Sequence, residues 1–260
     1  MQFGIIVQAR MGSKRFPGKV LKKYKGISIL KVLIDKLKFI KYGKLIVATT
    51  KNKNDKKIIE FCKKNNVKYF VGSTNNVLER YYKCAKKYNI KNIIRLTADC
   101  PFIDLNLLKK MSFIFDSKNY HYLSNTYPLP CKYPDGSDIE IFTFKVLNKA
   151  FLNAKLPSEK EHVTNLIYKK KSKKIKRIDP IKNLSNYRYT IDNKNDFKIF
   201  KKVIDEFNYD KILKLKMGEL VKFLDKNPNL TKYQKGIIRN YGWKSSILKD
   251  QKFMKLKIDD

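Results

Sequence analysis

The chain has few of the residues that build disulfide frameworks and zinc sites. Its 260 residues include only four cysteines and two histidines. The cysteines are far apart in the sequence and form no C-x-x-C pair: Cys62, Cys84, Cys100 and Cys131. This pattern argues against a disulfide scaffold and a structural zinc site. It favours a reducing compartment, so we expect a cytoplasmic protein.

Long apolar runs are also missing. No run approaches the roughly 20 residues that a membrane span needs, and residues Met1–Val7 lack the basic, apolar and cleavage regions of a secretory signal. Hydrophobic residues still make up 43% of the chain. That share supports a packed core and argues against a disordered polycation. The length fits one large α/β domain, or one domain with an appendage.

Acidic residues are scarce. The chain has 23 Asp and Glu but 59 Lys and Arg, which gives a formal net charge of +36. Such a charge is compatible with nucleic-acid binding. However, only seven of the basic residues are arginines, and the lysines are spread over the whole chain. Nucleic-acid surfaces favour clustered charge and arginine. The lysine excess therefore favours solvated helix faces, and we expect no nucleic-acid partner.

The few arginines that remain in such a lysine-rich background indicate places that need a planar, permanently charged group. Two of them, Arg10 and Arg15, lie in the glycine-containing loop Arg10–Lys19. Glycines let backbone N–H groups approach a ligand, and the basic side chains can neutralise phosphates. The loop lacks the P-loop pattern, because Val20 follows Gly18-Lys19. From the residues alone, a phosphate cradle and an ordinary charged surface loop both remain open.

Short apolar strands alternate with amphipathic helices in the first half of the chain. This alternation predicts an α/β fold with a mostly parallel, Rossmann-like sheet. Ligands bind beyond the carboxyl ends of such strands, so the loop Arg10–Lys19 and the turn at Asp99 should share one edge. The expected strands are Phe3–Ala9, Lys44–Thr49, Val67–Val71 and Asn92–Thr97, and the expected helices are Ile29–Phe39, Asp55–Asn65, Asn76–Tyr88 and Asp104–Phe115, with Asp104 as an N-cap.

Beyond residue 118 the pattern becomes less regular. We expect one main domain over residues 1–205 and a C-terminal helical extension over residues 206–260, which Trp243 would anchor to the core. The expected extended segments are Tyr120–Asn125, Ser137–Phe144, Lys174–Ile178 and Asn186–Ile191, and the expected helices are Phe144–Ala154, Glu159–Lys170 and Asn195–Phe207.

Two aspartates, Asp99 and Asp192, each follow an expected strand. Either one could simply close a turn or cap a helix. Together, at the end of two strands of one sheet, they suit Mg²⁺, which prefers a few carboxylates with phosphate oxygens and water. We therefore predict a magnesium site at Asp99 and Asp192.

The segment Gln8–Lys19 resembles the signature of CTP-dependent nucleotidyltransferases that make CMP-sugars. It is most similar to the spore-coat polysaccharide branch, which is related to the 3-deoxy-manno-octulosonate and acylneuraminate cytidylyltransferases. The resemblance covers about residues 1 to 205, and five of the seven arginines lie inside its matched segments. It continues in order through Val77–Tyr81, Arg95–Pro101, Asp135–Glu140, Glu161–Thr164 and Tyr187–Asp192.

The resemblance implies a nucleotide-diphospho-sugar transferase fold and assigns roles to matched positions. Arg10, Arg15 and Lys19 would hold the triphosphate of CTP. Asp99 and Asp192 match the metal-binding aspartates, so Mg²⁺ is the implied cofactor. Lys14 and Phe16 depart from the usual residues, and the match over Thr49–Asp55 is too loose to assign a role there. The implied catalytic residues are Arg10, Lys19, Asp99 and Asp192; the nucleotide-binding residues are Ala9, Arg10, Gly12, Ser13, Arg15, Lys19, Arg80 and Asp99; and Asp138, Glu140, Glu161 and His162 suit the acceptor side or, alternatively, purely structural roles.

The implied reaction is transfer of CMP to a sugar acid or a related small anionic acceptor, with release of pyrophosphate, in surface polysaccharide or glycan biosynthesis. A homodimer is expected, with segment 120–145 as its interface.

Two other classes of protein remain open. A glycosyltransferase that uses a nucleotide-sugar donor would ordinarily carry a D-x-D metal motif, which the sequence does not contain. A basic nucleic-acid-binding protein would show steep salt dependence of binding.

Overall fold

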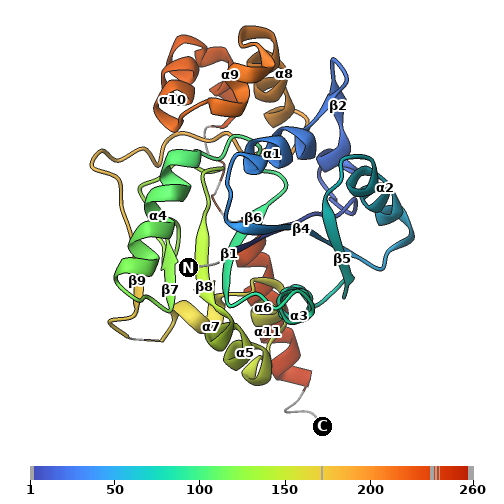
Figure 1. Cartoon of the computed structure of the whole chain (residues 1–260), viewed down its shortest axis with the longest axis vertical. Helices are drawn as coiled ribbons and strands as arrows, with labels where there is room; N and C mark the ends of the chain where they lie inside the picture. Colours follow the sequence, from blue (N-terminus) through green and yellow to red (C-terminus); the bar gives the residue numbers. More distant parts are fainter. Residues whose placement is uncertain (1–2, 171, 235–236, 238, 240, 257–260) are drawn as a thin grey trace.

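The computed structural model describes residues 3–170, 172–234, 237, 239 and 241–256. Its centre is a seven-stranded sheet in the order β5-β4-β1-β6-β8-β7-β9 (Figure 1). A separate two-stranded hairpin joins β2 to β3. The strands are β1 Phe3–Gln8, β2 Lys23–Tyr24, β3 Ile27–Ser28, β4 Gly43–Thr50, β5 Lys68–Gly72, β6 Asn92–Thr97, β7 Tyr122–Ser124, β8 Glu140–Thr143 and β9 Ile175–Arg177.

Only one strand of the seven-stranded sheet, β8, runs against the others. β1 pairs in parallel with β4 and β6, β4 pairs in parallel with β5, and β7 pairs in parallel with β9. β8 is antiparallel to both of its neighbours, β6 and β7. The carboxyl ends of β1, β4, β6 and β7 therefore share one edge with the amino end of β8. We call this the carboxyl edge, and the predicted mostly parallel α/β fold is confirmed.

Helices cover both faces of the sheet, because alternate side chains of its strands point to opposite sides. Ile5 and Val7 of β1 pack into the core with α1, α2 and α4, whereas Ile6 packs into the core with α3 and α5. The helices of these layers are α1 Ile29–Lys38, α2 Lys56–Lys64, α3 Val77–Lys87, α4 Leu105–Ser117, α5 Phe144–Asn153, α6 Pro157–Glu161 and α7 Asn165–Tyr168, with 3₁₀ turns η1 Lys19–Leu21 and η2 Lys53–Asp55.

The C-terminal part is helical, as expected. α8 Asp196–Glu206, α9 Tyr209–Lys214 and α10 Met217–Lys226 lie together at one end of the molecule, and α11 Tyr241–Leu256 packs beside α6 at the other (Figure 1). α8, α9 and α10 share an apolar core with Phe16, Ile29 and Phe102. The side chain of Trp243 lies outside the described residues. The domain boundary at residue 205 stays a prediction.

Two predicted elements are wrong. Asn186–Ile191 is no strand, because its backbone bonds to loops: the N–H of Tyr189 donates to Asp135 O (2.8 Å), and the N–H of Ile191 donates to Asp99 O (2.8 Å). The expected helix Glu159–Lys170 is split into α6 and α7, and Val163 between them has a φ of 55°. The other expected strands and helices up to residue 207 are confirmed, with shifts at their ends.

Two further expectations concern the cysteines and the dimer interface. The four cysteines are free and buried. Most of the expected dimer segment 120–145 is buried within the chain, and its exposed residues are 128–130, 132 and 145. The homodimer stays a prediction. Within the described part of the chain, no helix is long and apolar enough to cross a membrane.

Candidate functional site

The loop Arg10–Lys19 leaves the carboxyl end of β1 and folds around a single carbonyl. The backbone N–H groups of Ser13 and Gly18 both donate to Met11 O, each at 2.9 Å. Gly18 makes the turn possible, since its φ of 70° is strained for residues with a Cβ. The loop exposes the side chains of Arg10 and Arg15 and buries that of Lys19.

Lys19 joins the two predicted metal-binding aspartates. Its Nζ lies 2.7 Å from Asp99 Oδ2 and 2.7 Å from Asp192 Oδ1. Burial lowers the pKa of Lys19, but the charges of the two aspartates outweigh it and raise this pKa to about 12. Burial likewise opposes ionisation of Asp192, yet Lys19 and Arg15 bring its pKa well below the usual range. The ammonium and the carboxylate of Asp192 are therefore both charged at neutral pH.

Asp192 is also held from its other side by two arginines. Arg15 Nη2 lies 3.1 Å and Arg188 Nη2 lies 3.0 Å from Asp192 Oδ2. Arg188 is buried and also pairs with Asp135 and, at 3.3 Å, with Asp196. Burial and the charge of Asp138 raise the pKa of Asp135, although Arg188 opposes this. Arg188 thus fixes the position of Asp192, a role that the motif comparison did not assign.

The geometry of Asp99 and Asp192 fits a magnesium ion that arrives with other ligands. Both carboxylates already bind one cationic centre, the Lys19 ammonium, so it stands in for an ion between them. Oxygen donors of this kind suit Mg²⁺, which keeps several waters and phosphate oxygens. The residues that the structure describes contain no cluster of three or more His, Cys, Asp or Glu that could hold a metal. A triphosphate and water would have to complete the coordination.

A polar cavity of about 180 Å³ adjoins this ion-pair cluster at the carboxyl edge. Three of the four predicted acceptor residues line it, together with Asp99 and Asp192. Glu161 does not, since its carboxylate accepts hydrogen bonds from Ser246 (2.9 Å) and Lys249 (3.3 Å) of α11. The cavity is lined by Arg95, Thr97, Asp99, Cys100, Tyr127, Asp135, Asp138, Glu140, His162, Thr190 and Asp192.

Glu140 reaches the cavity because β8 is reversed. As the first residue of β8, it is in register with Arg95 of β6 and Ser124 of β7. Its buried carboxylate pairs with Arg95 and accepts hydrogen bonds from Tyr122 Oη (2.7 Å) and Thr164 Oγ1 (2.5 Å). Glu140 is therefore a compensated charge that ties β6, β7 and α7 together at the cavity wall.

The C-terminal extension also reaches the acceptor side. Arg239 donates to Asp138 Oδ1 (2.6 Å) and to Tyr133 O (2.6 Å), which fixes the loop before β8. His162 Nε2 lies 2.9 Å from Ser246 Oγ of α11. Arg239 belongs to none of the matched segments, although the scarcity of arginine in the chain is a signal that could have identified it.

Arg80 lies apart from these ion pairs, on α3. Its guanidinium is buried, donates to Ser73 O (2.7 Å), and has an Nε without a hydrogen-bond partner in the described part of the chain. Burial lowers its pKa, and the charge of Arg10 contributes in the same direction. The nucleotide-binding role of Arg80 stays a prediction. Ala9 is buried. Its N–H donates to Ala48 O (3.1 Å), which extends the pairing of β1 with β4 by one residue.

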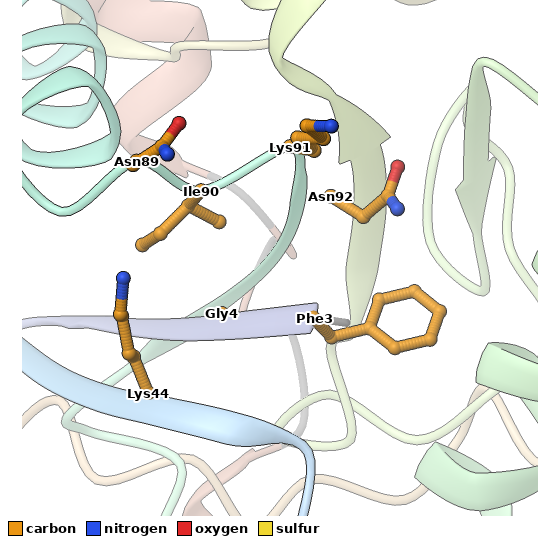
Figure 2. A pocket seen from close by; sticks show the side chains of 7 residues that line it. All are labelled: Phe3, Gly4, Lys44, Asn89, Ile90, Lys91 and Asn92. Carbon is orange, nitrogen blue, oxygen red and sulfur yellow. The ribbon is translucent and has the colours of Figure 1, made fainter. Parts of the chain in front are cut away.

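A larger cavity, of about 420 Å³, lies at the opposite edge of the sheet. Figure 2 shows Phe3, Lys44 and Asn92 around it, near the amino ends of β1, β4 and β6. A Cβ on Gly4 would come within 2.6 Å of Ile90, so glycine is needed for this close approach. None of the residues lining this cavity is acidic or a histidine. None of the predicted catalytic, nucleotide-binding or acceptor residues lines this larger cavity.

Asp55 has no role assigned by the family resemblance, and it anchors the loop Arg10–Lys19. Its buried Oδ1 accepts from the N–H of Met11 (2.7 Å), and its Oδ2 accepts from Thr50. We expect Asp55→Ala to lower the free energy of unfolding by about 2 kcal/mol or more, because two buried donors lose their acceptor. Urea unfolding would measure this loss. Asp55→Asn, which can pair with both groups, is the matched control and should lose less than half as much; equal losses would contradict the anchoring role.

His162 predicts a pH-dependent contribution to stability. Burial lowers its pKa below 6.5, with Arg95 and Lys249 adding to this, while Glu161 and Glu140 oppose it. The unfolded chain therefore binds a proton more readily than the folded chain just below pH 6.5, so stability falls there as the pH falls. Urea unfolding at pH 7.5 and 5.5 should show a smaller acid loss for His162→Gln than for the wild type. An acid loss in His162→Gln as large as that of the wild type would contradict this contribution.

Comparison with known proteins agrees with this geometry. A family model described as cytidylyltransferase matches residues 4–237. An uncharacterised protein of Methanocaldococcus jannaschii is 36% identical over 86% of this chain and 91% of its own length. The spore coat polysaccharide biosynthesis protein SpsF of Bacillus subtilis is 28% identical over 86% of this chain and 94% of its own.

Solved structures show the same similarity. A cytidylyltransferase structure from Leptospira borgpetersenii has a TM-score of 0.82 and 36% identity, covering 88% of this chain and 96% of that one. A CMP:2-keto-3-deoxy-manno-octonic acid synthetase complexed with CTP has a TM-score of 0.56 at 15% identity, covering 79% and 99%, and shows the shared fold. The resemblance read from the motifs, including its spore-coat branch, is confirmed.

Proposed function

The chain belongs to the cytidylyltransferase family and is a nucleotidyltransferase, and on that premise we propose that it transfers CMP from CTP to a hydroxyl of a sugar acid or a related small anionic acceptor. One observation carries the proposal: Lys19 joins the loop Arg10–Lys19 to Asp99 and Asp192, which line a polar cavity. Family membership sets aside the glycosyltransferase alternative. The absence of a nucleic-acid partner, a homodimer and a cytoplasmic location stay predictions.

In this reaction the protein contributes positioning and charge neutralisation. The triphosphate lies on the loop, where Arg10, Arg15 and Lys19 neutralise it and the backbone around Gly12 and Ser13 can approach closely. The acceptor hydroxyl loses its proton to solvent water as its oxygen attacks the α-phosphorus in line, and the new P–O bond forms as the bond from the α-phosphorus to the β-phosphate oxygen breaks. Pyrophosphate leaves with that electron pair, and the basic side chains stabilise its charge.

Asp99 and Asp192 would hold Mg²⁺ together with the triphosphate. When bound, this ion would polarise the α-phosphate and make the acceptor hydroxyl more acidic. Arg188 holds the carboxylate of Asp192, and the N–H of Ile191 donates to the backbone carbonyl of Asp99. These contacts matter because a displaced aspartate would displace the α-phosphate.

The lining of the cavity supports an acceptor rich in hydroxyl groups. Apart from Asp99 and Asp192, its carboxylates are each compensated by an arginine: Glu140 by Arg95, Asp135 by Arg188 and Asp138 by Arg239. Paired carboxylates still accept hydrogen bonds, so the wall can bind hydroxyls without a large uncompensated charge. The similarity to a spore coat polysaccharide biosynthesis protein supports a role in surface polysaccharide or glycan biosynthesis.

A pyrophosphate-release assay tests this function. The protein is mixed with Mg²⁺, one of CTP, UTP, ATP or GTP, and a panel of eight- and nine-carbon ulosonic acids, other sugar acids and neutral sugars. We expect pyrophosphate with CTP and a sugar acid, and a CMP-linked product by mass spectrometry. Pyrophosphate only with another nucleotide, or only with neutral sugars, would contradict the proposed substrates.

A further inference from the structure

The ammonium of Lys19 occupies the position between the two carboxylates that are proposed to bind the metal. It lies 2.7 Å from one oxygen of Asp99 and 2.7 Å from one oxygen of Asp192, and its side chain is 9% exposed. The same residue is needed on the triphosphate in the proposed function. A single ammonium group cannot lie between the carboxylates and also make way there for a divalent ion.

We propose that Lys19 is an internal counter-ion that keeps metal off Asp99 and Asp192 until nucleotide binds, and that the triphosphate then draws its ammonium away so that the ion can enter. This inference rests on the proposed function, since it names how the same site is loaded. It predicts that metal and CTP bind in a strongly coupled manner and that the protein alone binds metal weakly.

Electrostatics make the exchange necessary. An ammonium and a divalent cation that share two carboxylate oxygens would repel each other across a few ångströms in a partly buried site. Two carboxylates are also too few ligands for Mg²⁺ without the oxygens of a triphosphate. Lys19 and the metal therefore compete for the same oxygens in the nucleotide-free protein.

The local structure allows Lys19 to move without unfolding the loop. Its backbone is held at the start of η1, where its N–H donates to Phe16 O (3.1 Å) and the N–H of Gly18 donates to Met11 O (2.9 Å). Only the flexible side chain has to turn from the aspartates to the loop that carries Arg10 and Arg15. A long lysine stem with one terminal charge suits such a movement better than a planar guanidinium.

The two aspartates would respond differently to this movement. Asp192 keeps Arg15 and Arg188 as partners after Lys19 leaves. Asp99 has Lys19 as its only salt-bridge partner in the described part of the chain. When Lys19 leaves, Asp99 therefore keeps no salt-bridge partner among the described residues. The incoming ion should bind Asp99 first.

Metal binding without nucleotide tests this inference. Free Mn²⁺ is measured by electron paramagnetic resonance during titration of the full chain and of Lys19→Met, which keeps the length of the side chain and removes its charge. We expect Lys19→Met to bind Mn²⁺ at least about 10-fold more tightly than the wild type. Adding CTP should tighten Mn²⁺ binding strongly in the wild type and much less in the variant.

Two controls separate the local effect from bulk charge. Lys14→Met removes an exposed lysine from the same loop and should leave the Mn²⁺ affinity at the wild-type value. Adding Asp99→Asn to Lys19→Met should abolish the gained affinity, because Asp99 is the carboxylate that loses its salt-bridge partner. Equal Mn²⁺ affinity of wild type and Lys19→Met without nucleotide, or an equal gain in Lys14→Met, would overturn the inference.

The proposed function has a separate test, which is the binding of CTP to the wild type measured by calorimetry. A wild type that binds no CTP would refute the CTP-dependent function, whereas the nucleotide-free Mn²⁺ comparison would still report on Lys19. Thermal unfolding of Lys19→Met checks that the variant is folded. If it is not, Lys19→Gln is a polar replacement that should also bind Mn²⁺ more tightly than the wild type.

Discussion

Replacing Asp99 by asparagine should lower the rate of CMP transfer by about 10³-fold while leaving the fold intact. The amide has the shape of the carboxylate but carries no charge, so it loses both the proposed metal bond and the ion pair with Lys19. Rates would be measured by pyrophosphate release at saturating CTP, with the acceptor that the substrate panel identifies. Thermal unfolding of the variant should stay within a few degrees of the wild type.

Asp210→Asn is the matched control for this prediction, because Asp210 is an exposed aspartate at the start of α9 that does not line the cavity. It should transfer CMP at the wild-type rate. Near-normal activity of Asp99→Asn would remove Asp99 from the catalytic residues. A large loss of stability would instead mean that Asp99 acts mainly as a structural partner of Lys19.

The elements that local sequence patterns specify could be predicted. The expected N-cap at Asp104 is an example: its Oδ1 accepts from the N–H of Asn106 (2.8 Å) and of Leu107 (3.2 Å). The apolar strands β1, β4 and β6 are buried on both faces, as their continuous apolar character indicates. The carboxyl-edge rule then placed the basic loop next to Asp99 correctly.

The predictions that failed depend on partners far away in the sequence. Asn186–Ile191 is extended, as its residues suggest, but its hydrogen bonds go to Asp135 and Asp99 rather than to a strand. Asp192 was therefore placed at the site for a partly wrong reason, since no strand precedes it. The helix Glu159–Lys170 is broken where Thr164 turns its hydroxyl to Glu140, a contact that periodicity cannot report.

The unassigned site residues are also long-range partners. Asp55 is 44 residues from Met11, and Arg239 is 101 residues from Asp138. Neither belongs to a motif that matched the family closely. Their functional value lies in holding loops in place, and such a role becomes visible only when the partner loop is known.

The loss of Arg188 should be the most damaging change to stability. Its buried guanidinium contacts the carboxylates of Asp135, Asp192 and Asp196. Arg188→Met removes this charge and leaves three carboxylates close together. Breaking a buried ion pair from one side typically costs about 3–5 kcal/mol, so we expect a loss of that size in urea unfolding at pH 7.5.

The pH dependence of this loss distinguishes charge repulsion from a packing defect. Without Arg188 the crowded carboxylates hold protons more tightly in the folded than in the unfolded chain, so the stability of the variant relative to the wild type rises as the pH falls from 7.5 to 5. Arg15→Met removes another arginine from Asp192, but its side chain is 52% exposed, so the expected cost is below about 1 kcal/mol. A loss in Arg188→Met that is as small as this, or that does not shrink on acidification, would show that Arg188 is not the counter-charge that holds Asp192 in place.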